Sequence, residues 1–203
     1  MKALTKSTQE QITPTSALQI LVDGNKRFVE NTSIKRDLLG QVSDTSTGQY
    51  PFAAVLSCID SRVPAEIVFD QGIGDVFSAR VAGNIVNEDM LGSIEYACKV
   101  AGSKLVVVMG HTKCGAVTAA CKNVELGNVT ALLSKIKPAV EMCSKGVEMD
   151  AEAIEEVAIQ NVLLSIENIR KESPILADME KEAQIKIVGA IYNVTTGKVE
   201  FLS

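Results

Sequence analysis

Residue types that bind or orient metal ions stand together in the hexapeptide "SCIDSR". Cys58 offers a thiolate, Asp60 offers a carboxylate, and Arg62 offers a guanidinium that can hold a carboxylate through paired hydrogen bonds. About fifty residues further along the chain, His111 and Cys114 follow a second apolar run. Thiolate and imidazole are the ligands that zinc prefers in proteins. The sequence therefore predicts that Cys58, His111 and Cys114 bind one zinc ion.

The residues before each ligand predict the element that positions it. The runs "PFAAVLSC", ending at Cys58, and "KLVVVMGH", ending at His111, are continuously apolar, which is typical of parallel strands buried on both faces. Cys114 opens the expected helix "CGAVTAACKNV", and a helix N-terminus favours the thiolate form. Because ligands bind beyond the carboxyl ends of parallel strands, we expect the three side chains to meet at that edge.

Three protein ligands leave the fourth tetrahedral position for water or substrate, which is typical of a catalytic zinc site. Zinc in such a site can lower the pKa of its water from about 15.7 to about 7, which makes hydroxide available at neutral pH. Asp60 could accept the hydrogen of that hydroxide and fix its orientation. The same carboxylate could instead bind the metal in a closed state, and we expect Arg62 to hold it away.

The paired motifs "CIDSRVPAE" and "GHTKCGAV" resemble the signature of the β-class carbonic anhydrases, C-x-D-S-R followed by H-x-x-C-G. The resemblance runs from "GNKRF" to the C-terminal strand. It implies reversible hydration of carbon dioxide to bicarbonate and a proton by zinc-hydroxide attack, with one zinc ion per chain. It also implies an obligate homodimer, and it leaves open whether dimers pair into tetramers or larger assemblies.

The same resemblance implies further residues of the substrate pocket. Gln49 is similar to a glutamine that donates a hydrogen bond to substrate across the dimer interface in plant-type members. Phe77 and Tyr96 match lining positions of that pocket, and Gly115 follows the second cysteine as in the family. Val55 stands where bicarbonate-inhibited members carry tryptophan, although Arg80 matches the arginine of that regulatory site. We therefore expect the open, plant-like form of the site.

Three other functions fit parts of the pattern. The same scaffold can hydrolyse carbonyl sulfide or carbon disulfide. A cysteine nucleophile with His111 as its base would be a thiol hydrolase, but it would leave Cys114 and the aspartate–arginine pair unused. A structural zinc module would need a fourth Cys or His. The chain has no second histidine, and we expect the remaining cysteines to be buried in helices: Cys98, Cys121 and Cys143. Because the only histidine is a predicted metal ligand, export of the proton would use water, buffer or Tyr96.

Composition limits the remaining classes. The 203 residues are 46% apolar and 22% charged, which indicates one globular domain over 1–203. The net charge of −5 and the absence of a basic patch argue against a nucleic-acid partner. No apolar run approaches the length of a membrane span. The odd cysteine number and the polar N-terminus predict reduced thiols and a cytoplasmic protein.

Strands that alternate with helices predict an α/β fold with a mostly parallel sheet flanked by helices. We expect an N-terminal helical arm over 1–35, packing outside the main sheet or on a partner subunit. Residues 37–50 are polar and predict a loop, whereas 87–102 predict one helix ended by Gly102. Residues 127–170 predict a helical region in two pieces with a break around Gly146, and a C-terminal edge strand closes the sheet.

Overall fold

A five-stranded sheet forms the centre of the computed structural model, which describes residues 2–144 and 149–202. The strand order is β2-β1-β3-β4-β5; the first four are parallel, and β5 runs antiparallel to β4. The α/β class and the edge position of the last strand are thus confirmed. The strands are β1 (Ala53–Ser57), β2 (Val76–Arg80), β3 (Leu105–His111), β4 (Lys186–Tyr192) and β5 (Val199–Phe201).

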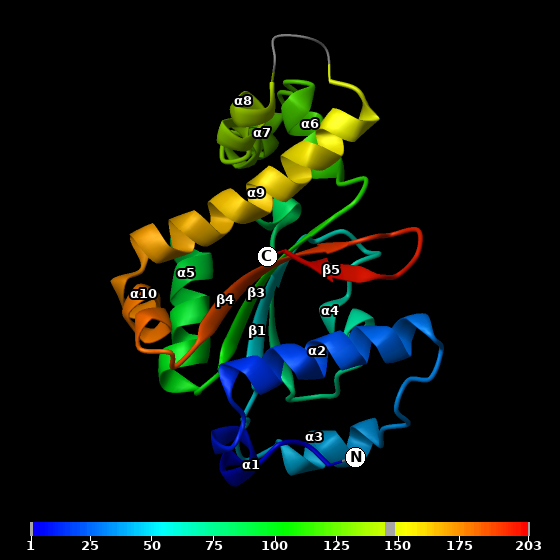
Figure 1. Ribbon diagram of the computed structural model, residues 1–203, viewed down its shortest axis with the longest axis vertical. Coiled ribbons are helices and arrows are strands. Elements are labelled where there is room, and N and C mark those ends of the chain that lie inside the picture. The colour runs from blue at the N-terminus through cyan, green and yellow to red at the C-terminus, as the bar shows by residue number, and fades with distance from the viewer. Residues whose placement is uncertain (1, 145–148, 203) are drawn as a thin grey trace.

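Helices cover both faces of this sheet (Figure 1). One face packs against α2 (Pro14–Val29) and α4 (Ala65–Val68). The other packs against α5 (Glu88–Glu95), η2 (Tyr96–Val100), α9 (Ala151–Glu172) and α10 (Pro174–Lys181). Beyond the carboxyl ends of the strands, α9 also packs against a lobe of short helices: α6 (Gly115–Cys121), α7 (Gly127–Leu133) and α8 (Lys137–Cys143). Of the helices described, none is both long and apolar enough to cross a bilayer.

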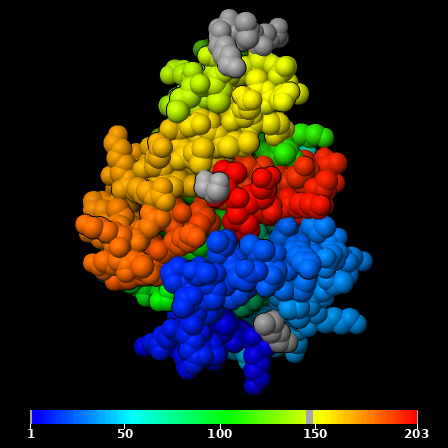
Figure 2. All heavy atoms as spheres, in the orientation of Figure 1, coloured from blue at the N-terminus to red at the C-terminus, as the bar shows by residue number. Residues whose placement is uncertain are grey.

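The N-terminal arm contributes to the chain's own core. Helix α2 begins at a Thr13 capping box with Pro14 in its first turn, and it buries Ala17 and Leu21 completely against the sheet. In Figure 2 this arm, coloured blue, forms the surface next to the red C-terminal strand. One face of α2 thus packs on the outside of the sheet of its own chain. Contact of the arm with a partner subunit stays a prediction.

The polar segment 37–50 is not wholly a loop, because it contains α3 (Leu38–Asp44). The side chain of Asp37 accepts a hydrogen bond from the Gly40 amide and so caps this helix. Gln41 is 1% exposed and accepts a hydrogen bond from the Ile73 amide. The apolar residues of this helix, Leu38, Leu39 and Val42, are exposed, and its buried residue is polar. The helix therefore has no apolar face toward the core, which is the signal that periodicity relies on.

One helical prediction is confirmed with a different last turn, and one needs correction. The helix over 87–102 is α5 followed by a π-helical turn, η2 (Tyr96–Val100), and Gly102 follows it with φ +84°. The first of the two helical pieces expected over 127–170 is divided into α7 and α8 at residues 134–136. Pro138 lies at the start of α8, where its fixed φ suits a first turn. The predicted break around Gly146 lies outside the described residues.

A buried ion-pair cluster joins the N-terminal arm to the segment before β2. Asp70, whose side chain is 3% exposed, accepts hydrogen bonds at 2.5 Å from both Arg27 and Arg36. Burial raises the pKa of this carboxyl, but the hydrogen bonds from Arg27 and Arg36 outweigh it and lower the pKa below its usual value. The carboxylate is therefore the form that stabilises the fold.

Asp70→Asn is expected to lower the free energy of unfolding by about 3–5 kcal/mol, because two arginines lose their buried counter-ion. Since the folded pKa lies below the unfolded value of about 3.9, this stabilisation is present at pH 7 and is lost as pH falls through the folded pKa. Urea unfolding of the variant and the parent at pH 7 and near pH 3 measures both effects. Glu10→Gln, in the exposed pair with Lys6, is the control and should change stability little.

Candidate metal centre

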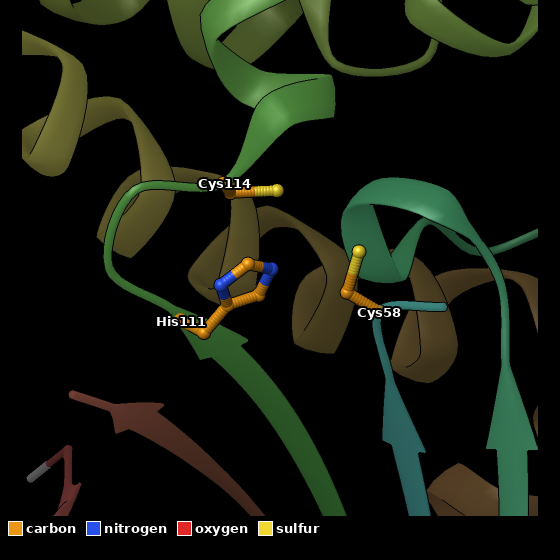
Figure 3. A group of neighbouring side chains, drawn as sticks. All are labelled: Cys58, His111 and Cys114. Atoms are coloured by element: carbon orange, nitrogen blue, oxygen red, sulfur yellow. The ribbon is translucent and has the colours of Figure 1, made fainter. Parts of the chain in front are cut away.

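Three elements bring the predicted ligands together at the carboxyl edge of the sheet. Cys58 follows β1, His111 is the last residue of β3, and Cys114 precedes α6 as its N-cap. One ligand atom from each lies within 4.8 Å of the others, and all three residues are buried. Figure 3 shows the two sulfur atoms and the imidazole ring turned toward a common point. Within the described chain, no other group of three or more His, Cys, Asp or Glu side chains has this arrangement.

The imidazole of His111 tests whether a metal fits this site. Its Nδ1 lies 2.9 Å from the Thr112 carbonyl oxygen, which can only accept, so Nδ1 carries the proton. Nε2 then has a free lone pair, yet it is fully buried without a hydrogen-bond partner. Such an unpaired group is costly unless a ligand satisfies it. Two thiols and one unprotonated imidazole nitrogen are a donor set that fits zinc.

The environment of Cys58 favours its thiolate. The hydrogen bond from Cys114 is the main cause that lowers the pKa of the Cys58 thiol. Burial acts in the opposite direction, the neighbouring His111 side chain lowers the pKa, and backbone hydrogen bonds from Gly83 and Asp60 lower it further. The Gly83 amide donates to the Cys58 Sγ at 3.3 Å. A negatively charged sulfur is the form that a metal requires.

Asp60 is held beside the ligand group by Arg62. The Arg62 Nε lies 2.9 Å from Asp60 Oδ1, Nη2 lies 2.7 Å from Oδ2, and the Arg62 amide also donates to Oδ1 at 2.9 Å. These hydrogen bonds, against the opposing effect of burial, hold the pKa of Asp60 far below its usual range. Asp60 Oδ2 is 3.9 Å from His111 Nε2. The carboxylate is thus an ionised acceptor next to the three ligands and paired with the guanidinium.

Arg80 braces the loop that carries these groups. It stands opposite Ser57 in the β1–β2 register, donates from Nε to the Cys58 carbonyl at 3.0 Å, and donates from Nη2 to the Asp60 carbonyl at 2.6 Å. From the sequence, Arg80 matches only the arginine of a regulatory site that Val55 argues against, and no bracing role is predicted for it. Its position at the end of the next strand is the signal that could have indicated the bracing role.

The predicted substrate residues lie elsewhere in the chain. Gln49 precedes β1 and Cys58 follows it, so a five-residue strand of about 16 Å separates them. Phe77 is paired in register with Ala54, near the start of β1. Its ring packs edge-on against the ring of Tyr96, with 6.2 Å between the two ring centroids. These side chains belong to the amino edge of the sheet, and a single chain does not bring them to the metal ligands.

Gly115, in contrast, lies directly beside the ligands. It is the first residue of α6 and follows Cys114. A Cβ placed on Gly115 would meet no atom within 4 Å, so the position opens onto free space. That space adjoins a ligand and is compatible with the predicted substrate-side role.

Comparison with known proteins decides the family. The carbonic anhydrase family profile matches residues 53–199, which include all three ligands. The fold is similar to the crystal structure of the β-carbonic anhydrase CafA from Aspergillus fumigatus, with 26% identity and a TM-score of 0.76 over 92% of this chain and 90% of that one. This chain belongs to the β-class carbonic anhydrases. The curated carbonic anhydrase of Mycolicibacterium smegmatis is 34% identical to this β-carbonic anhydrase over 94% of each chain.

A tetrameric β-carbonic anhydrase from Sordaria macrospora is a second structural neighbour of this β-carbonic anhydrase. It is 25% identical, with a TM-score of 0.71 over 78% of this chain and 83% of that one. These relatives confirm the resemblance that the paired motifs indicated. The enzyme class, carbonate dehydratase, follows from the family.

Proposed function

We propose that this β-carbonic anhydrase hydrates carbon dioxide reversibly at a zinc ion held by Cys58, His111 and Cys114. The observation that carries the proposal is the His111 Nε2, which is buried and unpaired. One nitrogen of this imidazole and the sulfurs of Cys58 and Cys114 lie within 4.8 Å of one another. One zinc ion per chain would satisfy that nitrogen. The substrates are carbon dioxide and water, and the products are bicarbonate and a proton.

Zinc, when bound, supplies a Lewis acid that makes water a nucleophile at neutral pH. Asp60 accepts the hydrogen of the nucleophile and so directs the oxygen lone pair toward the substrate carbon. Arg62 keeps Asp60 ionised and prevents it from turning to the metal, because the two side chains are joined through both carboxylate oxygens. The open form of the site is the form in which this pair is intact.

Removal of the metal tests the proposal. Dialysis against a zinc chelator is expected to abolish carbon dioxide hydration, and one equivalent of zinc per chain is expected to restore it. Hydration that persists in metal-free protein would contradict the zinc site, and inactivation by thiol alkylation without any effect of chelators would support a cysteine nucleophile instead. Parallel rates on carbon dioxide and carbonyl sulfide decide between the hydratase and the related hydrolase.

A homodimer would complete the substrate pocket. Strand β2 lies at one edge of the sheet and pairs only with β1 in the described chain. If two chains met at this edge about a two-fold axis at right angles to the strands, the β2 strands of the two chains would run in opposite directions. The amino edge of one subunit would then lie beside the carboxyl edge of the other, which would bring the partner subunit's Gln49 toward Cys58 and Asp60.

Two observations support this arrangement. A cavity of about 710 Å³ runs along β2, and Phe77, Arg80 and Tyr96 are among its lining residues. Large apolar side chains are exposed near both ends of this edge, including Ile59, 60% exposed, and Tyr96, 52% exposed. Exposed apolar surface of this kind is typical of an interface. Assembly into a tetramer, as in the Sordaria macrospora relative, is compatible with the dimer.

Mixed dimers test whether Gln49 acts across the interface. A dimer of one Gln49→Ala chain and one Asp60→Asn chain, isolated with two different tags, is expected to recover about half of the wild-type rate. One of its sites would combine an intact Asp60 with the partner's intact glutamine, and the other would hold both defects. Activity no higher than the mean of the two parent homodimers would contradict the shared site.

We infer the cellular setting from composition alone. The five cysteines are odd in number and form no disulfide, which supports a cytoplasmic enzyme. The acidic net charge supports an enzyme that acts without a nucleic-acid or membrane partner.

A further inference from the structure

A short turn lies against one of the ligand sulfurs. The 3₁₀ turn η1 (Ala82–Asn84) follows β2, and its Gly83 amide donates a hydrogen bond to the Cys58 Sγ at 3.3 Å. In Figure 3 this turn is the green coil beside Cys58. Because an N–H donor withdraws electron density from a thiolate, the position of this amide affects the charge that the sulfur can give to a metal.

The backbone of this turn is fixed by close packing. Gly83 has φ +68°, a left-handed conformation that favours glycine. A Cβ added there would lie 2.5 Å from the Ile136 Cδ1 and 3.3 Å from the Ala116 Cβ. Gly83 is therefore enclosed between Ile136 and the first turn of α6, the helix that begins directly after the ligand Cys114. The turn thus contacts Cys58 directly and also contacts the helix that follows Cys114.

Helix α9 holds this turn from its outer side. Asn161, in the middle of α9 and 3% exposed, donates from Nδ2 to the Gly83 carbonyl at 2.8 Å. One helical turn later, the Ser165 hydroxyl donates to the Asn84 carbonyl at 3.3 Å. Neither side chain reaches the metal ligands, and each bonds a backbone carbonyl about eighty residues away in sequence. The Asn161 bond holds the peptide group that follows Gly83, and the Ser165 bond holds the next one. Together they restrain the position of Gly83, whose own N–H belongs to the preceding peptide group.

We propose that Asn161 is a positioning residue of the metal centre, which acts through Gly83 on the Cys58 sulfur. The chain of contacts is continuous: the Asn161 amide holds the Gly83 carbonyl, and the Gly83 amide holds the sulfur. The inference rests on the proposed zinc site. Its consequence is that the metal's affinity and the sulfur's electron donation depend on a helix that supplies no ligand.

Substitution of the metal by Co²⁺ allows electron donation from the sulfur to be measured spectroscopically. In Asn161→Ala the Gly83 amide is expected to move from the sulfur, which then becomes a stronger electron donor. The sulfur-to-cobalt charge-transfer band of the Co²⁺ protein should shift to longer wavelength. Zinc affinity, measured by chelator competition, should nevertheless fall about 10-fold, because the sulfur is then held less firmly in the position that the metal requires. Ser165→Ala, which removes the longer hydrogen bond, should give a smaller shift in the same direction and provides a second variant should the first not fold.

Ile169→Val is the control. Ile169 is buried on the same helix, but it packs in the hydrophobic core between α9 and the sheet and not against η1. It should lower the thermal stability of the metal-free protein while leaving the band and the zinc affinity unchanged. A band that stays in place in both Asn161→Ala and Ser165→Ala would overturn the inference. Failure of the parent protein to bind zinc or cobalt would instead refute the proposed function.

Discussion

Cys58→Ser is expected to remove zinc from the enzyme and abolish carbon dioxide hydration. A serine hydroxyl stays protonated at neutral pH and is a poor zinc ligand, whereas the Cys58 sulfur lies in surroundings that favour the thiolate. Metal analysis should find zinc per chain falling from one toward zero, and stopped-flow measurement should find the hydration rate at the uncatalysed background.

Cys143→Ser is the control for this change. Cys143 lies at the end of α8, partly buried and outside the ligand group, so the same exchange of sulfur for oxygen should leave zinc content and rate intact. A Cys58→Ser protein that keeps a full zinc complement and the parental rate would refute the assigned ligand set.

Asp60→Asn is expected to retain zinc and lose at least about 100-fold in hydration rate. An amide can offer only one oxygen acceptor, and it replaces the charged partner that Arg62 holds through both carboxylate oxygens. The nucleophile would then lose its ionised orienting acceptor. Metal analysis and the hydration rate should be measured on the same preparation, so that a loss of activity is separated from a loss of metal.

Asp37→Asn, the same substitution at a site away from the ligands, is the control for Asp60→Asn. Asp37 caps α3 through the Gly40 amide, and asparagine caps helices equally well, so neither stability nor rate should change. An Asp60→Asn enzyme as fast as the parent would exclude this carboxylate from the mechanism.

The local features of the fold were predictable from the sequence because their signals are local. Apolar runs of strand length predicted β1 and β3, and the residues after each run placed Cys58 and His111 at strand ends. Parallel strands have a common carboxyl edge, so their convergence followed from the pattern. The chemistry of sulfur and imidazole then indicated zinc. The helix α3 was missed because its apolar side chains are exposed and its buried residue is Gln41, whose partner Ile73 lies 32 residues away in the sequence.

The sequence by itself determined which side chains could bind the metal and at which edge of the sheet they would meet. Only the tertiary structure decided what holds them there: Arg80 on the Cys58 and Asp60 carbonyls, and Asn161 on the turn whose amide reaches the sulfur. It also placed Gln49 at the opposite edge from Cys58. The physical reason is that a ligand's type is a property of one residue, whereas its support comes from hydrogen bonds between segments far apart in the chain, which no local pattern records.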